Sequence, residues 1–180
     1  VGGVVLSAAN DNITGYGNLD INTTQTSELI NNQQSLALFR QPLVISGGPV
    51  IEEDAVPPTR LPTPPFTPIP LFVAIAHEGD SYPNTAVFNG LTNVPSNMAI
   101  GATWQPELAQ QVGEVVGHEL SNLGINMLFG PSLDVLENPD PVSPSDLGVR
   151  SFGGDPYWVG VMGSAYTVGV HTGSNNRIAV

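Results

Sequence analysis

Short, continuously apolar runs separated by longer polar stretches are the main pattern along this 180-residue chain. The clearest runs cover residues 1–6, 71–76 and 125–129, the last of which contains one polar residue, Asn126. Uninterrupted apolar runs of this length are typical of strands buried on both faces, as in parallel sheets. The pattern therefore predicts three buried parallel strands, and residues 177–180 resemble the beginning of a fourth.

Between these runs, the apolar residues follow the spacing of helices. Residues 26–39 predict one helix, and residues 106–123 predict a second, because their apolar positions recur at steps of three or four. Pro106 suits the first helical position and Gly124 suits a left-handed stop. Asp155 is expected to cap a third helix that begins at Pro156. The residues expected to face inward from this third helix are Val159, Met162, Ala165, Tyr166 and Val170.

Residues 41–70 interrupt this alternation with nine prolines. Proline lacks the backbone N–H that helices and central strands need, so neither is expected near the end of this stretch. We interpret it as an extended, exposed excursion within one domain that covers residues 1–180, and not as a linker between two domains.

The order of strands and helices predicts an α/β protein with parallel strands. A doubly wound sheet and a (β/α)8 barrel both fit. However, no Gly-x-Gly-x-x-Gly motif follows the first strand in a usable position and no phosphate loop is present, so nucleotide binding has no support. In a barrel, functional groups lie on the loops after the strands. Here those loops carry residues 77–80 and 131–134 and, further along, Arg150.

The charge balance restricts the partners. Sixteen acidic residues face four arginines and no lysine, and the net charge of −12 argues against nucleic acid and anionic membrane surfaces. No apolar run approaches the roughly 18 residues of a membrane-spanning helix. Cysteine is absent, and His118 and His171 have no second ligand at metal spacing, so neither a cofactor nor a metal site is expected. The scarcity of charges suits a secreted or extracytoplasmic protein.

A set of segments in fixed order makes the pattern more specific. They are Gly2-Gly-Val-Val-Leu6, Pro70-Leu-Phe-Val-Ala-Ile75, Glu78-Gly79, Pro95-Ser-Asn-Met-Ala-Ile-Gly-Ala-Thr103, Pro106-Glu-Leu108, Leu123-Gly-Ile-Asn126, Pro131-Ser-Leu-Asp-Val135, Asn138-Pro139 and Val149-Arg-Ser-Phe-Gly153. In this order, the chain resembles the N-terminal (β/α)8 domain of glycoside hydrolase family 3, most of all its β-N-acetylhexosaminidase branch. The resemblance implies a partial (β/α)8 barrel, corresponding to about half of that domain.

The resemblance also implies an activity. Family members are retaining glycosidases that hydrolyse O-glycosyl bonds, among them β-N-acetylhexosaminidases and β-glucosidases. Their Lys-His-Phe-Pro-Gly-His-Gly-type motif, acid/base histidine and nucleophilic aspartate would follow Val180. No catalytic residue is therefore expected in this segment, which alone should be inactive. The open strand edges of half a barrel should be covered by the remaining barrel segment or by another chain.

Four residues are candidates for binding a carbohydrate substrate. Arg150 matches a family arginine that hydrogen-bonds sugar hydroxyls, although it could instead pair with Asp134 or Asp155 to hold its loop. Asp134 could bind sugar or orient Arg150. Glu78 matches a recurrent glutamate with a structural or supporting role. His77 is either a ligand or a plain polar loop residue.

One departure from the family weakens the expectation of activity. The family commonly has a sugar-binding aspartate at the position of Ala76 and a glycine where Asp80 stands. Loss of that carboxylate favours a rival hypothesis, in which the chain is a non-catalytic, secreted carbohydrate-binding or structural relative. Trp104 and Trp158 flank helix starts, where they could stack on a sugar ring or simply pack as core or rim.

Overall fold

The computed structural model describes residues 2–6, 23–39, 68–79, 85–87, 89–138 and 147–180. Along the chain the elements are β1 (Gly3–Leu6), α1 (Thr23–Phe39), β2 (Phe72–Ala76), α2 (Asn97–Gly101), α3 (Pro106–Asn122), β3 (Met127–Phe129), the 3-10 turn η2 (Gly148–Arg150) and α4 (Pro156–Gly173). Most of the proline-rich stretch 41–70 and Asp80 lie outside the described residues.

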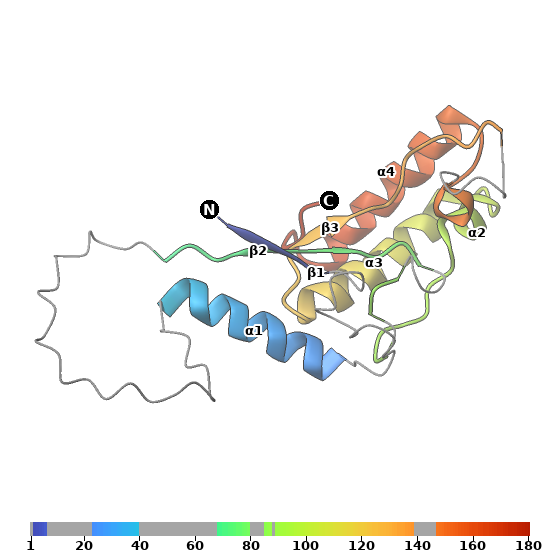
Figure 1. Cartoon of the computed structure of the whole chain (residues 1–180). Coiled ribbons are helices and arrows are strands. Elements are labelled where there is room, and N and C mark those ends of the chain that lie inside the picture. Colours follow the sequence, from blue (N-terminus) through green and yellow to red (C-terminus); the bar gives the residue numbers. More distant parts are fainter. Residues whose placement is uncertain (1, 7–22, 40–67, 80–84, 88, 139–146) are drawn as a thin grey trace, which may run out of the picture.

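The three strands form one parallel sheet in the order β1-β2-β3. Leu6 lies opposite Ile75, and Ile75 lies opposite Leu128 in the next strand. A parallel bridge from Met127 to Ala179 continues the sheet beyond β3. The α/β class with parallel strands is therefore confirmed (Figure 1). The bridge at Ala179 places residues 177–180 beside β3, where a fourth strand was expected to begin.

One face of the sheet is covered, and the other is largely open among the described residues. Leu6, Val73, Ile75 and Leu128 alternate along the strands and are buried in the main hydrophobic cluster, which also contains Ile30 of α1 and residues of α3 and α4. On the opposite face, the side chains of Val5, Phe72 and Phe129 are 47%, 44% and 50% exposed. The expectation that the strands are buried on both faces is thus wrong for these positions, because no described element packs on that face.

Polar contacts anchor α1 and the turn before β3 to β2. The side-chain amide of Gln34 in α1 both donates to the Leu71 carbonyl, at 3.0 Å, and accepts from its N–H, at 2.9 Å. Asn126 does the same across two residues, accepting from the Val73 N–H and donating to the Leu71 carbonyl. These paired bonds fix the position of β2, which carries the candidate residues at its end.

α3 and α4 lie side by side and pack through glycines (Figure 1). A Cβ atom at Gly117 of α3 would collide with the Val170 carbonyl of α4, so the two backbones meet where no side chain intervenes. The apolar stripe predicted for α3 is confirmed at Val116 and Leu120, which are buried, whereas Val115 is 37% exposed.

The helix ends agree closely with the sequence prediction. The Asp155 side chain caps α4 by accepting from the Trp158 N–H at 2.9 Å. His171 lies inside the last turn of α4. The short helix α2 was not predicted from the sequence; the Ser96 hydroxyl caps it by accepting from the Ala99 N–H.

Candidate functional site

An ion pair joins two of the predicted residues at the end of the sheet. Glu78 directly follows β2, and Arg150 ends η2 in the loop between β3 and α4. The Arg150 Nη1 and the Glu78 Oε2 are 3.6 Å apart. The Glu78 side chain is 9% exposed and that of Arg150 is 39% exposed, so the carboxylate is enclosed while the guanidinium remains open to solvent.

The surroundings of Glu78 decide its charge. Burial raises its pKa above the ordinary value, and the Arg150 charge and a hydrogen bond from the Ser132 backbone act in the opposite direction. The buried Tyr166 of α4 has a raised pKa, caused first by burial and then by the Glu78 charge, so its hydroxyl stays neutral. The guanidinium of Arg150 is therefore the main group that favours the ionised form of Glu78.

Buried polar groups hold the backbone around Arg150. The fully buried Ser151 hydroxyl donates to the Asp134 carbonyl, at 2.8 Å, and accepts from the Gly153 N–H, at 3.2 Å. The buried Asn97 side chain of α2 donates to the Arg150 carbonyl at 2.8 Å. These bonds fix the backbone position from which the Arg150 side chain extends. Neither Ser151 nor Asn97 was identified as a candidate from the sequence. Ser151 is adjacent to Arg150, but nothing in the sequence signals the long-range bond from Asn97.

The chain after Glu78 passes close to the loop that leads into α2. Gly79 has a φ of 79°, and a Cβ atom there would collide with the Pro95 carbonyl. Glycine accepts this conformation and leaves the needed space. The two loops at this end of the sheet are thus brought together by backbone contact.

Asp134 does not orient Arg150 through its carboxylate. Its side chain is exposed, and its backbone carbonyl is the group that contacts Ser151. The Asp155 carboxylate caps α4. Both alternatives for an ion pair of Arg150 are therefore wrong: the partner is Glu78. A sugar-binding role of Asp134 stays a prediction.

His77, which precedes Glu78, is also buried. Its side chain is 3% exposed, and its Nδ1 is buried without a hydrogen-bond partner among the described residues. Burial lowers its pKa from 6.5 to about 4, although the charge of Glu119 acts in the opposite direction. The ring is therefore neutral at pH 7. A ligand would reach it only after displacement of the atoms that cover it, and its role in binding stays a prediction.

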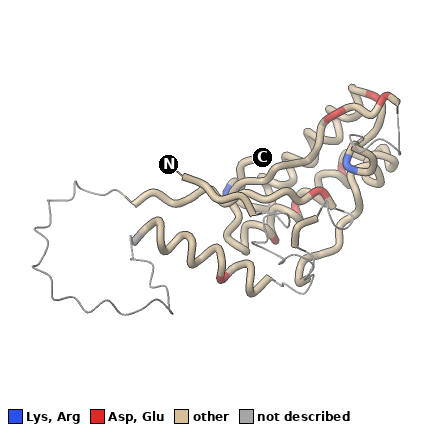
Figure 2. Tube along the Cα trace, in the orientation of Figure 1, with Lys and Arg blue, Asp and Glu red and all other residues tan. Residues whose placement is uncertain are grey.

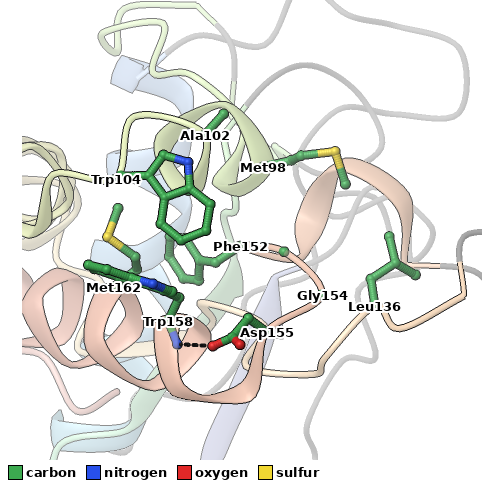
Figure 3. Close-up of a pocket in the computed structure, with 11 residues that line it drawn as sticks. Met98, Ala102, Trp104, Leu136, Phe152, Gly154, Asp155, Trp158 and Met162 are labelled. Carbon is green, nitrogen blue, oxygen red and sulfur yellow. Dashed lines mark hydrogen bonds between the residues drawn. The ribbon is translucent and has the colours of Figure 1, made fainter.

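An apolar pocket of about 350 Å³ lies between α2, the loop before α4 and the first turns of α4 (Figure 3). Trp104 and Trp158 meet edge to face in its wall, with ring centroids 5.0 Å apart. Trp104 is 58% exposed and has a φ of 55°, a conformation that costs a bulky residue about 1–3 kcal/mol. Trp158 is partly buried and Trp104 lies at the rim of the pocket, in agreement with the expected packing as core or rim. Stacking on a sugar ring stays a prediction.

Cations are scarce throughout the described residues. Arg150 and Arg177 are the two arginines among them, and they lie well apart (Figure 2). Arg177 donates to the Ser174 carbonyl and to the Ser121 hydroxyl, so it has a structural role. Within the same residues there is no group of three His, Cys, Asp or Glu side chains that could hold a metal ion. Nor is any helix in this part of the chain long and apolar enough to cross a membrane.

Comparison with known proteins identifies the family to which this α/β domain belongs. The family model described as the glycosyl hydrolase family 3 N terminal domain matches residues 61–177. The chain therefore belongs to glycosyl hydrolase family 3, as the sequence motifs indicated.

Named relatives and solved structures point the same way. The chain is 40% identical over 103 residues to beta-hexosaminidase A of Pseudoalteromonas piscicida, covering 54% of this chain and 16% of that protein. It is 34% identical over 91 residues to beta-glucosidase 2 of Saccharomycopsis fibuligera, covering 49% of this chain and 9% of that protein. The solved family 3 beta-N-acetylglucosaminidase of Paenibacillus sp. FPU-7 matches with a TM-score of 0.66 and 32% identity, over 96% of this chain and 25% of that chain.

A further solved structure, NagZ of Neisseria gonorrhoeae, shares the fold. It matches with a TM-score of 0.63 and 24% identity, over 96% of this chain and 40% of that one. The chain thus spans a quarter to two fifths of these two solved relatives, and a smaller share of the two curated proteins above.

Proposed function

We propose that this chain is the substrate-binding part of a retaining glycoside hydrolase that acts on β-linked glycosides, with β-N-acetylhexosaminides as the preferred substrates and β-glucosides as the alternative. Membership of family 3 and the names of the relatives support the class. The observation that carries the proposal is the Glu78–Arg150 pair at the carboxyl end of β2, because the loops after the strands are where barrel enzymes bind their substrates.

In this proposal Arg150 binds the sugar. Its guanidinium has several N–H donors in a planar fork, and the pair with Glu78 engages only one side of that fork. The open side suits two neighbouring hydroxyl oxygens of a sugar ring. Glu78 keeps the fork in position, while Asn97 and Ser151 hold the backbone beneath it. A preorganised donor pair loses little conformational freedom on binding, which favours affinity.

Cleavage of the glycosidic bond requires groups that we place outside this chain. In a retaining mechanism, a carboxylate attacks the anomeric carbon while a second group protonates the departing oxygen; water then hydrolyses the glycosyl-enzyme. The described residues supply binding and orientation. We further propose that additional barrel strands or another chain cover the exposed Val5, Phe72 and Phe129, and that the protein is secreted or extracytoplasmic, for which composition is the support.

One observation favours a second function, a non-catalytic carbohydrate-binding relative. Ala76 ends β2 on the open face of the sheet and is exposed, at the position where the family resemblance leads us to expect a sugar-binding aspartate. An alanine there leaves one sugar hydroxyl without an acceptor. Binding through Arg150 alone would persist, but catalysis that depends on that hydroxyl would be weak.

An assay of the natural full-length protein distinguishes the two. We expect it to release the aryl group from an aryl N-acetyl-β-glucosaminide faster than from the matching β-glucoside. Proton NMR during the first turnover should show the β-anomer of the product before mutarotation. Release of the α-anomer would contradict a retaining mechanism. Sugar binding without any turnover of either substrate would favour the non-catalytic relative.

A further inference from the structure

We propose that the pocket beside Trp104 and Trp158 is a second saccharide-binding site, which takes one pyranose ring of a neutral sugar chain. None of its lining residues belongs to the Glu78–Arg150 pair. The lining consists of Met98, Gly101, Ala102, Trp104, Leu136, Phe152, Gly153, Gly154, Asp155, Trp158 and Met162. Its volume of about 350 Å³ falls at the small end of ligand pockets, which suits a single ring and its substituents.

The walls of the pocket are fixed by backbone contacts. A Cβ atom at Gly101 would collide with the Phe152 carbonyl, and one at Gly154 would lie 2.7 Å from the Leu136 carbonyl. The edge-to-face contact of the two indoles then holds a third wall. Figure 3 shows these side chains around a common space, with Trp104 on the α2 side and Trp158 on α4. The pocket is therefore preformed and needs no rearrangement to open.

The chemistry of the lining selects the ligand class. No cation lines the pocket and the net charge of the chain is −12, so an anionic ligand is disfavoured. The indole rings and the two methionines offer apolar surface. One oxygen of the Asp155 carboxylate accepts a hydrogen bond from the backbone N–H of Trp158. Its other oxygen makes no hydrogen bond within the described residues. The indole N–H groups of Trp104 and Trp158 make no hydrogen bond within the described residues.

A pyranose ring matches this arrangement. It presents an apolar C–H face that can lie on an indole, and its hydroxyl groups lie around its edge, where a carboxylate accepts and an indole N–H donates hydrogen bonds. The ligand class follows from the pocket itself. Only the expectation that the ring belongs to a chain of β-linked N-acetylhexosamines rests on the proposed function.

Tryptophan fluorescence gives a direct test, because the 180-residue chain has two tryptophans and both line this pocket. The chain is titrated with N-acetylglucosamine and with its β-1,4-linked trimer. We expect a saturable change in emission with both sugars. Trp104→Ala should weaken binding at this pocket at least about tenfold, measured through the emission of the remaining Trp158. Circular dichroism checks that the variant is folded.

Two variants serve as controls. Tyr157→Ala removes an aromatic side chain that is 72% exposed and contacts Trp158 from outside the pocket, and it should leave the affinity unchanged. Arg150→Ala should leave the tryptophan response unchanged as well. Absence of a saturable response to both sugars would overturn the proposal, as would a response that Arg150→Ala abolishes and Trp104→Ala leaves intact. A response that persists in a full-length protein without glycosidase activity would support this site and refute the proposed hydrolase.

Discussion

We expect the folded protein to lose stability in mild acid because His77 is buried. In the folded protein its pKa is lowered to about 4 by burial, whereas an unfolded chain would protonate it near 6.5. Between these values the unfolded state binds more protons than the folded state. The stability from this group is therefore complete above about pH 6.5 and falls as the pH is lowered towards 4.

The size of the effect follows from the two pKa values. At about 1.4 kcal/mol per pH unit, the interval from 6.5 to about 4 corresponds to roughly 3 kcal/mol, of which about 2 kcal/mol is lost between pH 7 and pH 5. For a chain of this size, that corresponds to a fall in Tm of roughly 4–8 °C. Glu78 acts in the opposite sense: its raised pKa gives stability at low pH that is lost as the pH rises above 4.5.

A non-titrating variant separates the two groups. His77→Gln keeps Glu78 and removes the imidazole. The unfolding free energy of the wild type minus that of the variant should therefore fall by about 2 kcal/mol from pH 7 to pH 5. Urea unfolding at several pH values measures this difference. His118→Gln, which removes an imidazole at an exposed position, is the matched control. Parallel curves for wild type and His77→Gln would refute the reasoning.

Two further substitutions test the packing. Gly117→Ala should destabilise the chain by about 2–4 kcal/mol, because its methyl group would meet the backbone of α4. The control Gly160→Ala, whose Cβ would meet nothing within 4 Å, should stabilise the chain by about 0.5–1 kcal/mol. Equal urea midpoints of the two variants would contradict this. Asn126→Ala should cost about 2–4 kcal/mol, since its side chain bridges two backbone groups at the start of β2, while exposed Asn122→Ala should change the unfolding free energy by less than about 0.5 kcal/mol in the same assay.

The local pattern was enough to predict most elements of the fold. The strands β2 and β3 and the helices α3 and α4 follow from short-range signals such as apolar spacing, Pro106 and the Asp155 cap. Burial of both strand faces was not predictable in the same way, because exposure of Phe72 depends on what packs against the open face of the sheet.

The candidate site was predicted in part. Glu78 and Arg150 were identified as candidates from the resemblance to family 3, but their pairing was not predicted, because the acidic partners considered for Arg150, Asp134 and Asp155, both lie in the segment between β3 and α4. The fold instead brings a distant carboxylate to it from the end of β2. Asn97 and the burial of His77 likewise depend on loops that meet only in three dimensions.

The most direct test of the account is the dependence of hydrolysis on the guanidinium of Arg150. In the full-length protein, Arg150→Ala should lower kcat/KM for an aryl N-acetyl-β-glucosaminide at least about a hundredfold, and Arg150→Lys should restore only part of it, because a point charge cannot bind two hydroxyls as a planar fork does. Arg177→Lys, at the structural arginine, should leave kcat/KM within about twofold. An Arg150→Ala protein with wild-type kcat/KM would contradict the claim that this residue holds the sugar.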